Sequence, residues 1–414
     1  MLSELLPRMS THVAPGTHLS PSNGDTPPIR VTHLINGLHT GGAEMMLYKL
    51  LSRLDRSRID SNVITLTTSG PVGERIRGLG YEVSEIGMAR GRLNPVALLR
   101  LARRLRGQRP DVLQTWMTHS DLAGGLAARL AHNIPVVWNI QHSNFDPAAT
   151  NRLTLWAVRA CALLSSTLPS AIVSCSHEGL RVHAELGYRR EKMLVIPNGF
   201  DTDSFHSDQQ ARDSVRRELG LADDQFLVGA VSRFHPQKDH ACFIKAAAIV
   251  CQTMPRTRFV LCGDGISWSN PELASWLGAA NLRDSVFLLG RRTDTPAIMA
   301  ALDIFVSSSS FGEGFPNVVG EAMSCAVPCV VTQVGDSAIA VGETGRVVPP
   351  RDPAALAHEI AALLKASAIE RLNLGQAARR RIIDNFGLDA IVTQYANLYM
   401  KLAGRSAPIQ PPRS

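Results

Sequence analysis

Short apolar segments alternate with amphipathic helical patterns along the chain from Ile29 onward. Apolar strands separated by helices predict parallel sheets that are covered by helices on both faces. We therefore predict an α/β fold of two Rossmann-like, doubly wound domains that face each other across an interdomain cleft. The strands predicted for the first domain and then for the second are Arg30–Ile35, Ser61–Leu66, Tyr81–Ile86, Asp111–Trp116, Pro135–Ile140, Ser170–Cys175 and Met193–Pro197, followed by Phe226–Val231, Arg258–Cys262, Ser285–Leu289, Ile304–Ser307, Pro328–Thr332 and Gly345–Val348.

A run of turn-forming residues near Asn198 separates the two series of strands. It predicts an N-terminal domain over residues 29–200 and a second domain over 201–387, and a further helix over 388–403 closes the pattern. Residues 1–28 are rich in Ser, Thr, Pro and Gly and lack the apolar core of a signal peptide, so we expect a disordered tail or an upstream start. Residues 404–414 are also expected to be disordered.

Composition excludes several classes of protein. The 43 basic and 36 acidic residues give a formal net charge of +7, which permits anionic partners without identifying one. The apolar runs are too short to predict a membrane-spanning helix. The seven cysteines show neither a C-x-x-C pair nor a zinc spacing, so we expect core thiols in a reducing cytoplasm. No nucleic-acid-binding module appears, and no nucleic-acid partner is expected.

The strongest chemical signal is the segment 311–323, which follows a predicted strand and opens a helix. Pro316 suits the first helical turn, where its missing N–H group costs nothing. The free N–H groups of Asn317, Val318 and Val319, strengthened by the helix dipole, would then form a site for an anion.

Two glutamates lie eight positions apart in the same segment. Glu313 precedes the helix and Glu321 lies inside it, so one carboxylate would meet a ligand from the loop and the other from the helix. A plainer interpretation is that these residues only mark the start of a helix and that the glutamate is solvated. The flanking glycines, and the position directly after a strand, favour the functional interpretation.

Two further loops follow predicted strands. Arg233 and Lys238 lie on the loop after Phe226–Val231, where they could reach a diphosphate or remain solvated. Gly41 and Gly42 follow the first strand and would allow the backbone to approach a phosphate or a sugar. The chain contains no P-loop motif and no dinucleotide-binding fingerprint.

Weaker candidates also occupy strand ends. The Gly263 turn could line the cleft or be only a tight turn, and His142 and His119 follow two strands of the first domain. Asp201 and Asp203 form a D-x-D pattern, which we interpret as polar residues of a turn rather than metal ligands. No metal ion is therefore expected.

A basic run covers one face of the helix predicted after Asn94. A solvated face is the default interpretation, and contact with an anionic membrane surface is the alternative. The arginines of this run are Arg100, Arg103, Arg104, Arg106 and Arg109.

Taken together, these motifs resemble those of the family 4 retaining glycosyltransferases, which have the two-Rossmann-domain GT-B fold. The resemblance covers about residues 29–403 and is most specific in the Glu313…Glu321 pair. Other marks of the family are the segments 41–44, 195–199, 263–265 and 345–349 and the Arg233…Lys238 loop.

The resemblance implies roles for individual residues. Glu313 and His142 would lie at the reacting sugar, and the helix over 388–403 would cross back to the first domain. The residues that the resemblance places at the donor are Gly42, Arg233, Lys238, Gly263, Phe315, Pro316, Asn317, Val318 and Glu321.

The implied substrates are a nucleoside-diphosphate sugar and a saccharide or polyprenyl-linked acceptor, with no cofactor and no metal ion. The implied setting is surface-polysaccharide synthesis by a cytoplasmic protein, with a peripheral position on the inner face of the membrane as a further option. The alternatives left open are a nucleotide-sugar epimerase or hydrolase of the same fold and a non-catalytic sugar-nucleotide-binding protein. The chain departs from the family pattern at Asp239 and at Gly335-Asp336-Ser337-Ala338, which puts the identity of the sugar in doubt.

Overall fold

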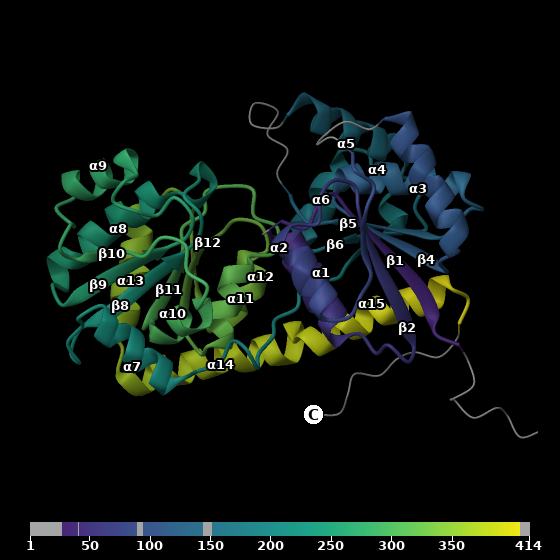
Figure 1. Ribbon diagram of the computed structural model, residues 1–414. Coiled ribbons are helices and arrows are strands. Elements are labelled where there is room, and N and C mark those ends of the chain that lie inside the picture. The colour runs from purple at the N-terminus through teal and green to yellow at the C-terminus, as the bar shows by residue number, and fades with distance from the viewer. Residues whose placement is uncertain (1–26, 40, 89–93, 144–150, 406–414) are drawn as a thin grey trace, which may run out of the picture.

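The computed structural model describes residues 27–39, 41–88, 94–143 and 151–405. These residues form two parallel β-sheets, each flanked by helices, so the predicted α/β fold of two Rossmann-like domains is confirmed (Figure 1). The tails predicted over 1–28 and 404–414 lie almost wholly outside the described residues. The strands are β1 (Ile29–Ile35), β2 (Ile59–Thr65), β3 (Val83–Glu85), β4 (Val112–Trp116), β5 (Val136–Ile140), β6 (Ala171–Ser174), β7 (Met193–Val195), β8 (Phe226–Val231), β9 (Thr257–Cys262), β10 (Val286–Leu288), β11 (Ile304–Ser307), β12 (Cys329–Thr332) and β13 (Arg346–Val348).

Strand order defines where a ligand would lie. The N-terminal sheet has the order β3-β2-β1-β4-β5-β6-β7, and the C-terminal sheet has the order β10-β9-β8-β11-β12-β13. The order therefore reverses between β1 and β4 in the first sheet and between β8 and β11 in the second. In open parallel sheets, the crevice beyond the carboxyl ends of the strands at such a reversal is the usual ligand site.

The helices begin where the sequence supplies N-terminal caps. The Asn94 side chain accepts a hydrogen bond from the N–H group of Ala97 at 2.7 Å, and Asp352 caps its helix in the same way through Ala355. The helices are α1 (Gly42–Arg53), α2 (Gly70–Gly78), α3 (Pro95–Gln108), α4 (Thr118–Leu130), α5 (Arg152–Leu164), α6 (His177–Glu185), α7 (Gln209–Glu218), α8 (His240–Thr253), α9 (Pro271–Ala279), α10 (Thr295–Ala301), α11 (Asn317–Ser324), α12 (Ser337–Val341), α13 (Pro353–Lys365), α14 (Ala368–Phe386) and α15 (Leu388–Leu402). None of the helices in the described ranges is long and apolar enough to cross a membrane.

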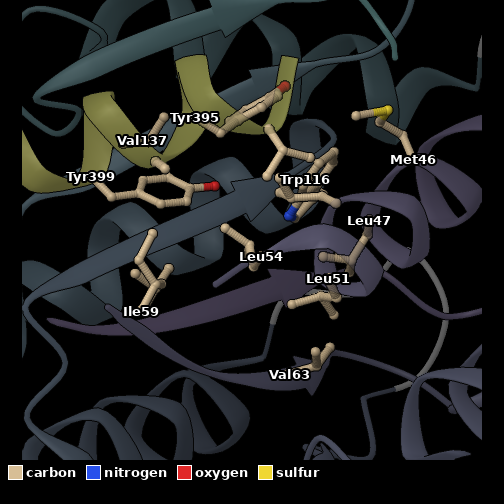
Figure 2. Packing of buried hydrophobic residues seen from close by; sticks show 14 of the residues in the cluster. Met46, Leu47, Leu51, Leu54, Ile59, Val63, Trp116, Val137, Tyr395 and Tyr399 are labelled. Carbon is tan, nitrogen blue, oxygen red and sulfur yellow. The ribbon is translucent and has the colours of Figure 1, made fainter. Parts of the chain in front are cut away.

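The last helix joins the two domains. α14 lies along the C-terminal domain, and α15 continues across to pack against α1 and β1 of the N-terminal domain (Figure 1). Tyr395 and Tyr399 of α15 are fully buried beside Trp116 (Figure 2), and the Asn139 side chain donates to the Tyr395 hydroxyl at 2.8 Å. The aromatic core of the first domain is therefore completed by residues from the C-terminal end of the chain.

The chain passes between the domains twice, and the two crossings touch. The N–H group of Phe200 donates to the carbonyl of Phe386 at 3.0 Å, and the N–H group of Leu388 donates back to Phe200 at 3.0 Å. This pair of hydrogen bonds ties the two crossings to each other at the boundary between the domains.

Candidate active site

The two loops with the strongest sequence signals leave adjacent strands. Arg233 and Lys238 follow β8, and Glu313 follows β11, its neighbour at the reversal of strand order. In the facing domain, Gly42 begins α1 after β1, and His142 follows β5. The fold thus brings the predicted residues to the carboxyl edges of the two sheets.

Glu313 is the centre of this constellation. It is buried, with 8% of the residue exposed, and its Oε1 atom lies 2.5 Å from the Lys238 Nζ atom. The Ser309 hydroxyl donates to the same oxygen at 2.6 Å. A buried carboxylate needs such compensation, because an unpaired buried charge is costly. No described residue forms a hydrogen bond with Oε2, so this oxygen is available to a ligand.

The loop that carries Glu313 is held from both domains. The Gln237 side chain donates to the carbonyl of Gly312 at 3.1 Å, and the Ser143 hydroxyl of the facing domain donates to the carbonyl of Glu313. Gly335 packs so closely that a Cβ atom there would overlap the same carbonyl, and its φ of +57° also favours glycine. The position of Glu313 therefore depends on both halves of the molecule.

Glu321 faces the N-terminal domain. Its Oε1 atom lies 3.8 Å from the Nζ atom of Lys49 on α1, and both side chains are more than four-fifths buried. Burial raises the pKa of Glu321, while the Lys49 charge lowers it. Sequence reasoning missed Lys49, because nothing local distinguishes a lysine on the surface of an amphipathic helix.

The start of α11 differs in one respect from expectation. The N–H group of Val319 donates to the carbonyl of Pro316 at 3.1 Å, so the expectation that it is free was wrong. No described residue accepts from the N–H groups of Asn317 and Val318, which remain available to an anion. The Phe315 ring packs in the core, where its centroid lies 5.0 Å from the centroid of the Phe386 ring.

Residues of the first domain touch this helix start. The Asn198 side chain donates to Asn317 Oδ1 at 3.0 Å, and a Cβ atom on Gly42 would lie 3.3 Å from Asn317 Nδ2. Glycine at position 42 therefore lets the backbone of α1 approach the proposed anion site.

Arg233 is exposed, and within the described part of the chain no acidic side chain forms an ion pair with it. Gly263, at the end of β9, lies against the start of the same loop. Its φ is +152°, and a Cβ atom there would overlap the carbonyl of Ser232. Gly263 thus shapes the loop that presents Arg233, whereas the guanidinium itself is free to bind an anion.

His142 directly precedes Ser143 and so lies near the Glu313 loop. Burial, with a smaller contribution from the neighbouring His119, lowers the pKa of His142 to about 4. The imidazole is therefore neutral at physiological pH and could exchange hydrogen bonds with a sugar. Its ring lies edge-on to that of His183, with 5.9 Å between centroids.

Asp336, one of the departures from the family pattern, connects the two domains. Its carboxylate accepts the N–H groups of His177 at 2.7 Å and Glu178 at 3.0 Å, at the start of α6. Its own N–H group donates to the carbonyl of Gly314 at 3.0 Å. Asp336 therefore links the Glu313 loop to a helix of the opposite domain, a role that the sequence alone did not reveal.

The D-x-D pattern in the linker forms a turn. Asp201 accepts hydrogen bonds from Ser204, and Asp201 and Asp203 both pair with Arg53, at 3.3 and 2.8 Å. Among the described residues, no cluster of three or more potential ligands could hold a metal ion. All seven cysteines are free, and all except the half-buried Cys251 are buried.

Comparison with known proteins agrees with this geometry. Residues 40–204 match the family model described as "Glycosyltransferase Family 4", and residues 225–366 match the one described as "Glycosyl transferases group 1". A putative glycosyltransferase of Bacillus subtilis, EpsF, is 31% identical over 316 residues, which cover 73% of this chain and 79% of that protein.

Two further similarities span most of the chain. An Escherichia coli enzyme named UDP-Gal:alpha-D-GlcNAc-diphosphoundecaprenol alpha-1,3-galactosyltransferase is 28% identical over 74% of this chain and 79% of its own length. The crystal structure of Anabaena HepE in complex with UDP superposes with a TM-score of 0.79 and 23% identity, covering 90% of this chain and all of that one. This chain therefore belongs to glycosyltransferase family 4, group 1 of the glycosyl transferases, and has the GT-B fold.

Proposed function

We propose that the protein transfers a sugar, with retention of anomeric configuration, from a nucleoside-diphosphate sugar to a lipid-linked saccharide in surface-polysaccharide synthesis. The observation that carries the proposal is Glu313: Lys238 and Ser309 occupy one of its carboxylate oxygens and leave the other for a sugar hydroxyl. The similar E. coli enzyme is named for a diphosphoundecaprenol-linked acceptor, and HepE was crystallised with UDP-glucose. Both names support this choice of substrates.

The surrounding charges suit departure of a nucleoside diphosphate. Breaking the anomeric bond places negative charge on the leaving diphosphate, which preorganised donors stabilise. Arg233 offers a planar fork that pairs with no acidic side chain of the described residues, and the N–H groups of Asn317 and Val318 lie at a helix N-terminus. Lys238 is paired with Glu313, so it balances the charge of that carboxylate. Arg233 and the helix N-terminus would then supply the positive charge that stabilises the leaving diphosphate.

Retention is proposed to follow from attack on the same face that the diphosphate leaves, with a phosphate oxygen taking the proton of the acceptor hydroxyl. A covalent route would need a free carboxylate at the anomeric carbon. Glu321 is engaged by Lys49 and Asp336 by the start of α6, so a covalent route would have to use the open carboxylate oxygen of Glu313. The front-face proposal assigns that oxygen to a sugar hydroxyl instead. Trapping a glycosyl adduct on Glu313 would contradict the front-face route.

We place this reaction in the cytoplasm, at the inner face of the membrane, where sugar nucleotides and the diphosphate end of a polyprenyl carrier would meet. The first test is to screen uridine and guanosine diphosphate sugars for a thermal shift. The best donor is then incubated with and without polyprenyl-diphosphate-linked GlcNAc in detergent, and the linkage formed is assigned by NMR.

We expect turnover that depends on the acceptor and gives an α-linked product from an α-linked donor. Arg233→Ala should abolish donor binding, whereas Arg217→Ala, which changes an exposed arginine on α7, should not. Donor consumption at an equal rate without acceptor would instead support an epimerase or hydrolase. Binding without any turnover would support a sugar-nucleotide-binding protein.

A further inference from the structure

A buried hydrogen-bond network leads from the last helix of the protein to the cleft. The Asn139 side chain donates through Nδ2 to the Tyr395 hydroxyl of α15 at 2.8 Å, and its Oδ1 atom accepts from Nε2 of Gln141, also at 2.8 Å. Asn139 and Tyr395 are fully buried, and Gln141 is half-buried. Gln141 directly follows β5, so the network ends at the carboxyl edge of the N-terminal sheet, where the cleft lies.

Both buried members of this network are held in place. The Tyr395 ring stacks on that of Trp116, with 6.2 Å between the ring centroids, inside the core of the first domain (Figure 2). The carbonyl of Asn139 accepts from the N–H group of Met117 at 3.0 Å. Since the side-chain oxygen and nitrogen of Asn139 both have partners, its amide has a single orientation. The network therefore fixes the direction in which the Gln141 amide points.

The Gln141 amide has one group left for a ligand. Its Nε2 atom donates to Asn139, and no residue in the described ranges donates to its Oε1 atom. Oε1 is not among the enclosed polar atoms of the described residues that lack a partner, so it is open to solvent. An amide oxygen accepts from hydroxyl and N–H groups and has nothing to offer a phosphate oxygen, which is itself an acceptor. Gln141 therefore suits the saccharide part of a substrate rather than a diphosphate.

The place of Gln141 in the cleft favours the second substrate. Ser143, two residues further on, donates to the carbonyl of Glu313, so Gln141 lies close to the loop that would hold the transferred sugar. The charged side chains assigned to the donor, among them Arg233 and Glu321, come from the opposite domain. A neutral acceptor of hydrogen bonds on the N-terminal side therefore faces the sugar from the side on which an acceptor molecule would arrive.

We propose that Gln141 binds the acceptor saccharide through Oε1, and that Asn139 and Tyr395 are positioning residues that hold its amide in the binding orientation. The group bound is a hydroxyl or an acetamido N–H group of the saccharide. The proposal rests on the proposed function, because it assigns a residue that receives the acceptor of that reaction. If the network only satisfied buried polar groups, Tyr395 would affect stability and leave the affinity for the acceptor unchanged.

The test is steady-state transfer by the full chain, with the acceptor varied at saturating donor and then the donor varied at saturating acceptor. The variants are Gln141→Ala and Tyr395→Phe. The matched control is Tyr399→Phe, one turn further along α15. Tyr399 is equally buried, and its hydroxyl forms no hydrogen bond with any described residue. Circular dichroism melts establish that all the proteins are folded.

We expect Gln141→Ala and Tyr395→Phe each to raise the acceptor KM about threefold to tenfold, the effect of losing one neutral hydrogen bond, without raising the donor KM. Tyr399→Phe should change neither value. The double variant Gln141→Ala with Tyr395→Phe should be no weaker than Gln141→Ala, because Tyr395 acts through Gln141. An unchanged acceptor KM in Gln141→Ala, or a rise in the donor KM instead, would overturn the proposal. Additive losses in the double variant would overturn the positioning role of Tyr395.

A binding measurement separates failure of this inference from failure of the proposed function. GlcNAc linked through diphosphate to a short alkyl chain is titrated calorimetrically into protein loaded with the nucleoside diphosphate that gives the largest thermal shift. Its Kd should rise in Gln141→Ala and Tyr395→Phe by the same factor as the KM. If the wild type binds this probe in that pattern but transfers no sugar, the proposed function fails and the assignment of Gln141 stands. Equal affinity in all the proteins, or no binding by the wild type, would overturn the assignment even where transfer is observed.

Discussion

Asp336 offers the most incisive test of how the two domains cooperate. Its carboxylate accepts two N–H groups at the start of α6, and its backbone is hydrogen-bonded to Gly314, beside Glu313. The contact exists only while the domains touch. We predict that Asp336→Ala lowers kcat because the Glu313 loop is no longer held against the N-terminal domain.

The magnitude follows from the two hydrogen bonds. A hydrogen bond to a charged group contributes about 1.5–3 kcal/mol. Burial raises the pKa of Asp336, which shows that desolvation offsets part of this gain. A net loss of about 2 kcal/mol would lower the ratio of closed to open molecules about thirtyfold. We expect kcat to fall by up to that factor, with a smaller change in the donor KM and partial recovery in Asp336→Asn.

The assay is steady-state transfer with the selected donor, combined with small-angle scattering to follow domain opening. The matched control is Asp352→Ala, which removes an aspartate at the start of α13 within one domain. This control should lower the melting temperature without lowering kcat once the protein is folded. Unchanged kcat and unchanged scattering in Asp336→Ala would refute the reasoning.

Three further predictions concern single sites. Ser309→Ala removes a hydrogen bond to Glu313 and should lower kcat/KM about tenfold or more, with recovery in Ser309→Thr; equal values in all three proteins would contradict this. His33 is buried, and burial lowers its pKa to about 3, so the folded state excludes a proton that the unfolded chain takes up below about pH 6.5. The free energy of unfolding should therefore fall as the pH drops from 6.5. Measured by urea unfolding, its decrease from pH 7 to pH 5 should be about 2 kcal/mol smaller for His33→Gln than for the wild type. An equal decrease in the two proteins would refute this prediction. Gly320→Ala would drive a methyl group into the Phe200 ring and should cost about 1–3 kcal/mol of stability, seen as a lower melting temperature; an unchanged melting temperature would contradict the close packing.

Local pattern predicted the central strands most accurately. β8 and β11 have the predicted limits, because an apolar run bounded by polar turn residues defines a buried strand. The edge strands β3 and β10 are shorter than predicted, since an edge strand is hydrogen-bonded to a neighbour on one side only. The apolar residues that flank these two strands pack against the hydrophobic core and lie beyond the paired positions of the strands.

The candidate site was predicted where its residues lie in one motif and missed where they come from distant segments. Glu313 and Glu321 lie before and inside α11, as their spacing indicated. Lys49 and Asp336 had no local signal, because each meets its partner across the cleft. Lys238 was expected at a diphosphate, and the structure pairs it with Glu313, whose buried charge needs a cation.

The central claim is that Glu313 holds the reacting sugar in this cleft. The most direct measurement is kcat for transfer by Glu313→Gln, compared with Glu359→Gln on α13, which alters a glutamate paired with Arg346 on a surface away from the cleft. Loss of an interaction made in the transition state typically costs a factor on the order of 10²–10³. The account predicts a loss of that order for Glu313→Gln and wild-type turnover for Glu359→Gln. Full turnover by a folded Glu313→Gln variant would contradict it.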